Sequence, residues 1–214
     1  MDLGRPLTVV TPTVDADVLM ILAGAETSFT GRQVQQVSGR HSEKGVRNTL
    51  HRLCSQGIVL RERVGSADLY TLNRAHLAAA HIQALASLRS ELLQRISTLL
   101  NAWEVPPDFA ALFGSAARGG MRPDSDIDLL VVRSDEVNAE SEDWRDQLAH
   151  LSERVTAWTG NDTRVLELSA AEVRRGLAGE ERVLTDIHAE GIVLYGSSSY
   201  LRPAPRRRGR AGRG

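Results

Sequence analysis

Two aspartates and a glycine-serine pair have the residue types and spacing that phosphate and metal chemistry require. Asp126 and Asp128 open an apolar run, and side chains two residues apart on a strand point to the same face. Gly114 and Ser115 follow an earlier apolar run, where glycine permits a tight turn and the next amides can open a helix whose N-terminus binds phosphate. Proteins usually hold Mg²⁺ by one or two carboxylates together with substrate phosphates. These four residues therefore predict a single site for a metal and a phosphate group.

The elements that must position this site follow from the apolar pattern. A glycine-serine turn alone is usually only a turn, and an Asp-x-Asp pair alone is usually solvated. Here the order strand, turn, short helix, loop, strand sets the carboxylates opposite the anion-binding turn. The expected elements are strands at 109–113, 129–132, 163–168 and 191–195, and helices at 116–118, 136–159, 170–177 and 181–190.

The strings GSAARG and PDSDIDLLV together resemble the signature of the nucleotidyltransferase superfamily that includes DNA polymerase beta, most closely its minimal nucleotidyltransferase branch. The resemblance implies a mixed sheet flanked by helices. It also implies that Gly114 and Ser115 hold the nucleotide phosphates and that Asp126 and Asp128 bind divalent metal, Mg²⁺ or Mn²⁺. Arg118 matches the motif arginine, as a phosphate or structural contact. The expected substrate is an NTP, with ATP as the first candidate among the four.

The third predicted strand leaves one catalytic role open. Active members of the superfamily usually carry a third carboxylate there, and Glu167 is the only acid inside the run. Glu167 shares a face with Val165, so it points either at the metals or away from them as an exposed strand residue. If it joins the site, it is the third catalytic residue. If it does not, the domain could bind nucleotide as a sensor.

The expected reaction is metal-assisted transfer of a nucleoside monophosphate to a hydroxyl, with in-line displacement of pyrophosphate. The acceptor could be a protein or a small molecule such as an aminoglycoside. An RNA end is disfavoured because residues 76–201 carry eleven Lys or Arg against twenty Asp or Glu and offer no RNA-sized basic groove. The alternative is a transcription regulator whose nucleotidyltransferase domain only binds or senses nucleotide. A third possibility is that both domains are scaffolds for partner contacts.

The N-terminal region has a different pattern. Helical spacing begins at Val14, a second helix follows Thr30, and Ser42 caps a third that stops at Gly57. Two strand-like runs then flank 65–68, which indicates a hairpin. Helix, helix, turn, helix, hairpin is the order of a winged helix-turn-helix.

The stretch from Thr30 to Asn73 resembles the winged-helix domains of bacterial transcription regulators, in which the third helix enters the DNA major groove and the wing touches the backbone. Between Arg32 and Arg63 there are seven Lys or Arg against two Glu, which favours double-stranded DNA as a partner. The alternative is a solvated helix face used for protein contacts. The candidate DNA contacts are His41, Lys44, Arg47, Asn48, His51 and Arg52 on the third helix and Arg61 and Arg63 on the wing.

The expected organisation mixes α+β and α/β regions. It comprises a winged helix-turn-helix at 1–73, a long amphipathic linker helix at 74–104, a nucleotidyltransferase domain at 105–196 and a disordered basic tail at 197–214. The gap-free helical pattern within it, from Arg74 to Leu100, would be about 40 Å long at 1.5 Å per residue. Its apolar stripe could pack within the chain or pair two copies in a homodimer.

Composition sets the outer limits. The chain has 214 residues, 42% of them hydrophobic and 25% charged, as in ordinary soluble proteins. It contains no run of eighteen apolar residues, so we expect a cytoplasmic protein without a membrane partner. A single cysteine, Cys54, excludes an internal disulfide and a cysteine-based zinc cluster. The last thirteen residues hold six arginines, which could add salt-sensitive affinity for nucleic acid.

Overall fold

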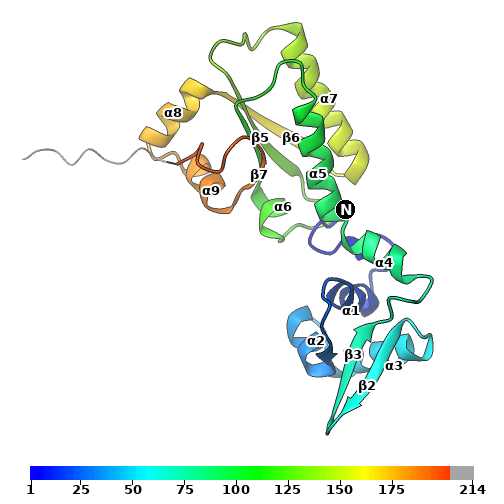
Figure 1. Ribbon diagram of the computed structural model, residues 1–214. Helices are drawn as coiled ribbons and strands as arrows, with labels where there is room; N and C mark the ends of the chain where they lie inside the picture. The colour runs from blue at the N-terminus through cyan, green and yellow to red at the C-terminus, as the bar shows by residue number, and fades with distance from the viewer. Residues whose placement is uncertain (203–214) are drawn as a thin grey trace, which may run out of the picture. The chain divides into compact units, whose positions relative to one another are not determined.

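A computed structural model describes residues 1–202, which divide into two compact units (Figure 1). The N-terminal unit consists of residues 1–92 with 121–124. The C-terminal unit consists of residues 93–120 with 125–202. Each unit has its own buried core.

The N-terminal unit combines helices with a small antiparallel sheet of strand order β1-β3-β2. The predicted helices and hairpin are present. The elements run η1 (Pro6–Val9), α1 (Val14–Ala23), β1 (Phe29–Thr30), α2 (Gly31–Ser38), α3 (Glu43–Ser55), β2 (Val59–Val64), β3 (Ala67–Leu72) and α4 (Ala79–Ala86).

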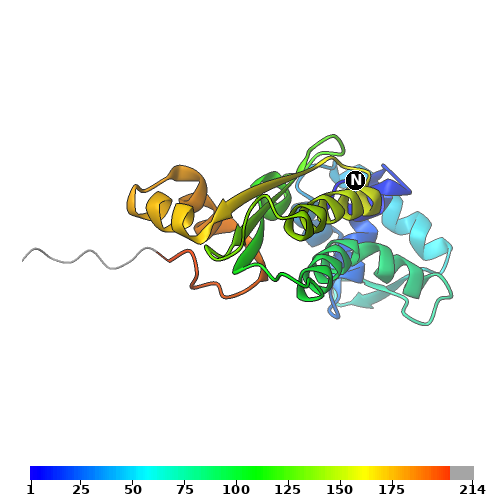
Figure 2. The ribbon, with the colours of Figure 1, turned by 90° about the horizontal axis from the view of Figure 1, so that it is seen from above.

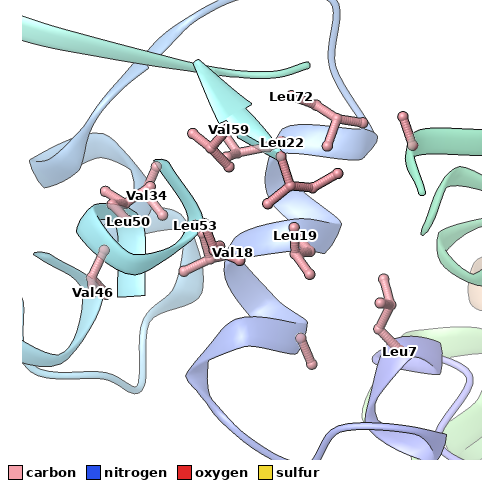
Figure 3. Packing of buried hydrophobic residues seen from close by; sticks show 13 residues of the cluster. Leu7, Val18, Leu19, Leu22, Val34, Val46, Leu50, Leu53, Val59 and Leu72 are labelled. Atoms are coloured by element: carbon pink, nitrogen blue, oxygen red, sulfur yellow. The ribbon is translucent and has the colours of Figure 1, made fainter. Parts of the chain in front are cut away.

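Local capping chemistry fixes the two helices before the hairpin. The Thr30 hydroxyl accepts from the Gln33 amide while the Gln33 side chain accepts from the Thr30 amide, which closes a capping box on α2. The Ser42 hydroxyl accepts from the Gly45 amide and starts α3. The apolar face of α3 is buried against α1 and α2, where Figure 3 shows Leu53 near Val18 and Leu50 near Val34. The opposite face of α3 is left to solvent.

The predicted linker helix at 74–104 is not one helix. It forms α4 and α5 (Leu88–Asn101), separated at Ser87, and begins five residues later than expected. Ser87 leaves helical geometry at φ −92° and ψ 3°, and its hydroxyl donates to the Ala84 carbonyl. A serine bonded to a nearby carbonyl competes with the helix ladder, which explains a break that the apolar spacing does not reveal. Leu92 and Ile96 of the predicted stripe are buried within the chain.

The C-terminal unit is built on a four-stranded mixed sheet of order β6-β5-β4-β7. Strands β5 and β6 are parallel, and β4 is antiparallel to both β5 and β7. The mixed sheet flanked by helices agrees with the expectation. Besides α5, the elements are β4 (Phe109–Phe113), α6 (Gly114–Arg118), β5 (Ile127–Arg133), α7 (Glu142–Thr159), β6 (Thr163–Ser169), α8 (Ala170–Ala178), α9 (Arg182–Glu190) and β7 (Ile192–Tyr195).

Helices cover both faces of this sheet. Leu130 and Val132 of β5 pack with α8 and α9 on one face. Helices α5 and α7 lie side by side on the other face (Figures 1 and 2). Trp103 and Trp144 meet there edge to face, with ring centroids 5.5 Å apart. The tryptophans are therefore core residues, and alternation along β5 sends Asp128, two before Leu130, to the face of α8 and α9.

The C-terminal unit extends beyond residue 196, where the sequence pattern placed the start of a disordered tail. The Tyr200 ring stacks on Phe109 at 5.2 Å, and Leu201 is buried in the core. These two apolar side chains pack residues 197–202 against the C-terminal unit. The arginine-rich part of the predicted tail, from residue 203, lies outside the described residues. Within residues 1–202, no helix is long and apolar enough to span a membrane.

Candidate functional site

The glycine-serine turn is built against an aspartate. Gly114 follows β4 and begins α6 with a φ of +69°, in the left-handed region that favours glycine. A Cβ at this position would lie 2.5 Å from Oδ2 of Asp128, so a side chain here would force the Asp128 carboxylate to move in addition to straining the backbone. Ser115 follows as a half-buried residue in the first turn of α6. The predicted phosphate turn and one predicted metal ligand therefore form one local structure.

The two aspartates lie where β5 begins. Asp128 pairs with Phe113 across the antiparallel ladder, which brings it beside the turn. Asp126 stands one residue before the strand and is partly exposed. Asn161 supports this entry, because its buried amide donates to the Ser125 carbonyl at 2.8 Å. Asn161 is thus a positioning residue that sequence reasoning missed.

Electrostatics makes negative charge unfavourable at this point. Burial raises the pKa of the Asp128 carboxyl, and the nearby Asp126 charge raises that pKa further, while Arg164 and Arg118 act in the opposite direction. A cation near the pair would relieve the repulsion. The carboxylate pair is therefore a site where positive charge is favoured.

Arg164 occupies the position next to Asp128 on β6. The two residues are register partners in the parallel ladder, so their side chains share a face. Nη2 of Arg164 lies 2.9 Å from Oδ2 of Asp126. The sequence did not predict this contact, because the register between β5 and β6 cannot be derived from the sequence of either strand alone.

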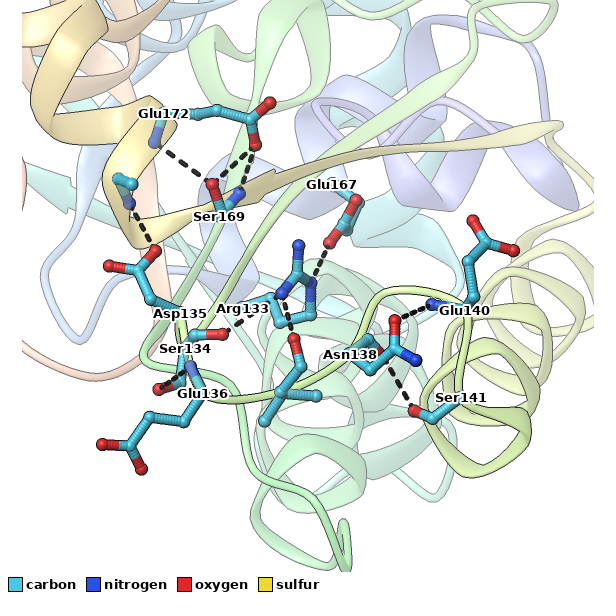
Figure 4. Close-up of polar contacts among 12 residues, drawn as sticks. Arg133, Ser134, Asp135, Glu136, Asn138, Glu140, Ser141, Glu167, Ser169 and Glu172 are labelled. Carbon is cyan, nitrogen blue, oxygen red and sulfur yellow. Dashed lines mark hydrogen bonds and ion pairs between the residues drawn. The ribbon is translucent and has the colours of Figure 1, made fainter.

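The structure does not bring Glu167 to the aspartates. Glu167 is level with Val131, on the face of the sheet opposite Asp128. Figure 4 shows its carboxylate accepting from Nε of Arg133 at 2.8 Å, and Arg133 also donates to the carbonyls of Ser134 and Val137. In this geometry Glu167 does not lie with Asp126 and Asp128, because the strand alternates and the register puts the acid on the other face of the sheet.

Arg118 lies at the end of α6 and is paired with α9. Its Nη1 is 3.1 Å from Oε2 of Glu190, and both side chains are about half exposed. Next to it is a pocket of about 390 Å³ between α6 and α9. Gly114 and Arg118 line this pocket, and the two aspartates do not. The lining residues are Phe113, Gly114, Arg118, Arg182, Val183, Asp186, Ile187, Glu190 and Gly191.

The predicted DNA contacts fall into two groups. Lys44, Arg47, Asn48 and His51 are exposed on α3, and no ion pair to any of them is seen within residues 1–202.

The other candidates already have carboxylate partners. Arg52 contacts Asp15, while Arg61 and Arg63 both contact Asp68 on the neighbouring strand, at 2.8 and 3.2 Å. His41 lies against Asp17, which also binds Arg5. The structure therefore reduces the free positive charge of the hairpin below what the sequence suggests.

The donor set of the aspartate site fits a divalent ion that arrives with phosphate. Within the described part of the chain, no three His, Cys, Asp or Glu side chains are grouped to hold a metal. A divalent ion such as Mg²⁺ is usually held by one or two carboxylates together with waters and substrate phosphates. Asp126 and Asp128 meet that condition because the phosphate-sized turn at Gly114 adjoins them.

A family model described as Polymerase beta, Nucleotidyltransferase matches residues 94–200, half of the chain. The chain belongs to this family. The match includes the turn at Gly114, both aspartates and Arg164. Membership in the polymerase beta nucleotidyltransferase family therefore covers the whole candidate site, and none of the predicted DNA contacts lies within it.

Solved structures are similar at low identity. A toxin-antitoxin with AMP-PNP is 18% identical over 49% of this chain and 73% of that chain, with a TM-score of 0.35. A mutant of the toxin-antitoxin MntA-HpeT is 16% identical with the same coverage and a TM-score of 0.34. TrmBL2, an archaeal chromatin protein, is 15% identical over 83% of this chain and 72% of that chain, with a TM-score of 0.27. No curated protein matches the chain.

Proposed function

We propose that the C-terminal unit is a metal-dependent nucleotidyltransferase that moves a nucleoside monophosphate from an NTP, with ATP the first candidate, to a protein or small-molecule hydroxyl. The observation that carries the proposal is the close approach of Asp128 to Gly114, where a Cβ would lie 2.5 Å from the Asp128 carboxylate. A phosphate turn and a metal-ligand pair in contact are what metal-assisted phosphoryl chemistry requires. Family membership agrees with this role.

The residues of this chain would divide the work as follows. The amides at Gly114 and Ser115 hold the β and γ phosphates, while Asp126 and Asp128 hold Mg²⁺ or Mn²⁺. The bound metal would neutralise phosphate charge and stabilise the entering and leaving oxygens. Arg118 can contact phosphate only after leaving Glu190, since the two side chains are paired at 3.1 Å.

The transfer itself exchanges one bond for another. The acceptor oxygen bonds to the α-phosphorus, the bond from that phosphorus to the bridging oxygen breaks, and pyrophosphate leaves. The acceptor proton passes to solvent or to a base on the acceptor, because Glu167, the acid of β6, faces away. An acceptor that supplies its own base fits a protein partner, where a side chain next to the modified hydroxyl can take the proton.

We further propose that the N-terminal unit is a winged helix-turn-helix that brings the enzyme to double-stranded DNA. The order α1, α2, α3, β2, β3 and the solvent-facing side of α3 support this assignment. Lys44, Arg47, Asn48 and His51 would enter the major groove. Arg61 and Arg63 would contribute less than two full charges to phosphate contacts, because both are paired with Asp68.

The test of transfer uses each NTP labelled at the α-phosphate, with Mg²⁺ or Mn²⁺, on purified full-length protein with and without host lysate. The Asp126→Asn/Asp128→Asn variant removes the proposed ligands, and Glu167→Gln is a matched control that removes a carboxylate from the opposite face. Label that depends on the aspartates and survives Glu167→Gln supports the proposal and identifies the acceptor. Label that persists in the aspartate variant, or no label with the wild type, refutes it, whereas label lost in both variants would return Glu167 to the site.

A second function is favoured by one observation. The place beside Asp128 on β6 holds Arg164, and an arginine remains protonated, so it cannot remove a proton from an acceptor. With such a site the unit could bind metal and nucleotide without transfer and act as a nucleotide sensor for a DNA-binding regulator. Metal-dependent nucleotide binding that changes DNA affinity, without label transfer, would select this function.

A further inference from the structure

Arg164 is the cation that the fold places against the proposed metal ligands. It is beside Asp128 in the β5-β6 ladder, and its guanidinium lies 2.9 Å from an oxygen of Asp126. The Arg164 side chain is 67% exposed, whereas that of Asp126 is 30% exposed. The guanidinium is therefore anchored at one carboxylate but has space to turn toward a ligand on the same side of the sheet.

A guanidinium and a divalent metal compete for Asp126. Both are cations, and occupying the same carboxylate brings them within a few ångströms, where their repulsion opposes metal binding. A triphosphate changes this balance, because its oxygens are strong acceptors for arginine and its negative charge offsets the metal. Arg164 should therefore act differently on a bare metal ion and on a metal-nucleotide complex.

We propose that Arg164 is a specificity-determining residue of the nucleotide site: it opposes binding of a free divalent ion at Asp126 and Asp128 and favours entry of the ion together with a triphosphate. On entry, the guanidinium exchanges the Asp126 carboxylate for a phosphate oxygen. This inference depends on the proposed nucleotide site.

The experiment measures Mn²⁺ binding by electron paramagnetic resonance and by calorimetry on the full chain. Each protein is titrated with Mn²⁺ alone, and then with a non-hydrolysable ATP analogue at saturating Mn²⁺. The variants are Arg164→Gln, which removes the charge, and Arg164→Lys, which keeps it. Arg145→Gln is the matched control, since Arg145 is also an exposed arginine paired with a carboxylate, Glu140 at 3.5 Å.

The expected result is a change of opposite sign in the two titrations. Because the pair is exposed and screened, Arg164→Gln should bind Mn²⁺ alone about tenfold more tightly and the analogue about tenfold more weakly. Arg164→Lys should remain near the wild type with Mn²⁺ alone, because its charge is retained. Arg145→Gln should match the wild type in both titrations.

Three outcomes would overturn the inference, and they separate it from the proposed function. If the wild type binds the analogue with Mn²⁺ and Arg164→Gln is unchanged in both titrations, Arg164 has no such role and the nucleotide site stands. If Arg164→Gln binds both ligands more tightly, Arg164 only shields the carboxylates. If the wild type and Asp126→Asn/Asp128→Asn behave alike, the nucleotide site itself is wrong, and the inference falls with it.

Discussion

Gly114→Ala tests the geometry of the site with a single methyl group. The native φ of +69° would hold alanine in the left-handed region, at a cost of about 1–2 kcal/mol. The new Cβ would also lie 2.5 Å from Oδ2 of Asp128, while the next atom, Cγ of the same residue, is at 3.4 Å. Rotation of the carboxylate relieves the overlap at about 0.5–1.5 kcal/mol. We expect a total destabilisation of about 2–3 kcal/mol.

Gly160→Ala is the matched control for the backbone term. Gly160 has a φ of +71°, and no atom lies within 4 Å of its hypothetical Cβ. It should cost about 1–2 kcal/mol, so the difference between the two variants isolates the contact with Asp128. Urea unfolding followed by tryptophan fluorescence measures the relevant transition, because the three tryptophans, Trp103, Trp144 and Trp158, lie in the C-terminal unit.

The functional effect should exceed the loss of stability. Rotating the Asp128 carboxylate away from Gly114 removes a proposed metal ligand from its place, so Gly114→Ala should lose metal-dependent nucleotide binding at least about tenfold, while Gly160→Ala keeps it. Adding Asp128→Ala should abolish the extra cost of Gly114→Ala, as a double-mutant cycle would reveal. Equal unfolding free energies for the two glycine variants, with nucleotide affinity intact in both, would refute the reasoning.

Three further changes test separate parts of the molecule. Asp128→Asn should raise the free energy of unfolding at neutral pH, by about 1 kcal/mol or less after solvent screening, because burial and Asp126 raise the pKa of this carboxyl in the fold. The penalty is full above the folded pKa and fades as the pH falls toward the unfolded value, so urea melts of the two proteins should converge in acid. Glu167→Gln should leave nucleotide binding unchanged. It should lower the free energy of unfolding by about 1 kcal/mol, because Arg133 loses a charged partner. A large loss of nucleotide affinity would instead return Glu167 to the site. Arg47→Ala should weaken DNA binding and reduce the slope of log affinity against log salt concentration by about 1. Asp68→Asn should strengthen DNA binding, because it frees the hairpin arginines Arg61 and Arg63. Fluorescence anisotropy titrations at several salt concentrations measure both affinities, and unchanged affinities in both variants would count against the DNA interface.

The parts of the fold that sequence could predict are those with local chemical causes. The caps at Thr30 and Ser42 and the strand at 109–113 are where the pattern placed them. The same holds for the turn at Gly114 and the aspartates after it, because an antiparallel pair of strands close in sequence brings Phe113 and Asp128 together by short-range geometry. A motif that lies within one pair of neighbouring strands can therefore be predicted from the sequence.

Other features depend on contacts between distant residues. The break at Ser87 interrupts a run whose apolar spacing looks continuous. The charge of Arg61 and Arg63 is reduced by Asp68, which becomes their neighbour only when β2 and β3 pair. Leu201 lies beyond the last predicted strand, yet it is buried in the core of the C-terminal unit. Counting charges or apolar residues along the chain cannot reveal these contacts.

The chemistry of the site is finally decided by one register. Strand β6 reaches β5 only after the α7 crossover, and a shift of one residue would turn Glu167 to the aspartate face and Arg164 away from it. Polar contacts hold the observed register: the Asp162 carbonyl accepts from the Ile127 amide at 2.8 Å, and the Ser152 hydroxyl of α7 donates to the Thr163 carbonyl at 2.9 Å. Under the proposed function, the choice between transferring a nucleotide and only sensing one therefore depends on which charge these contacts place beside Asp128.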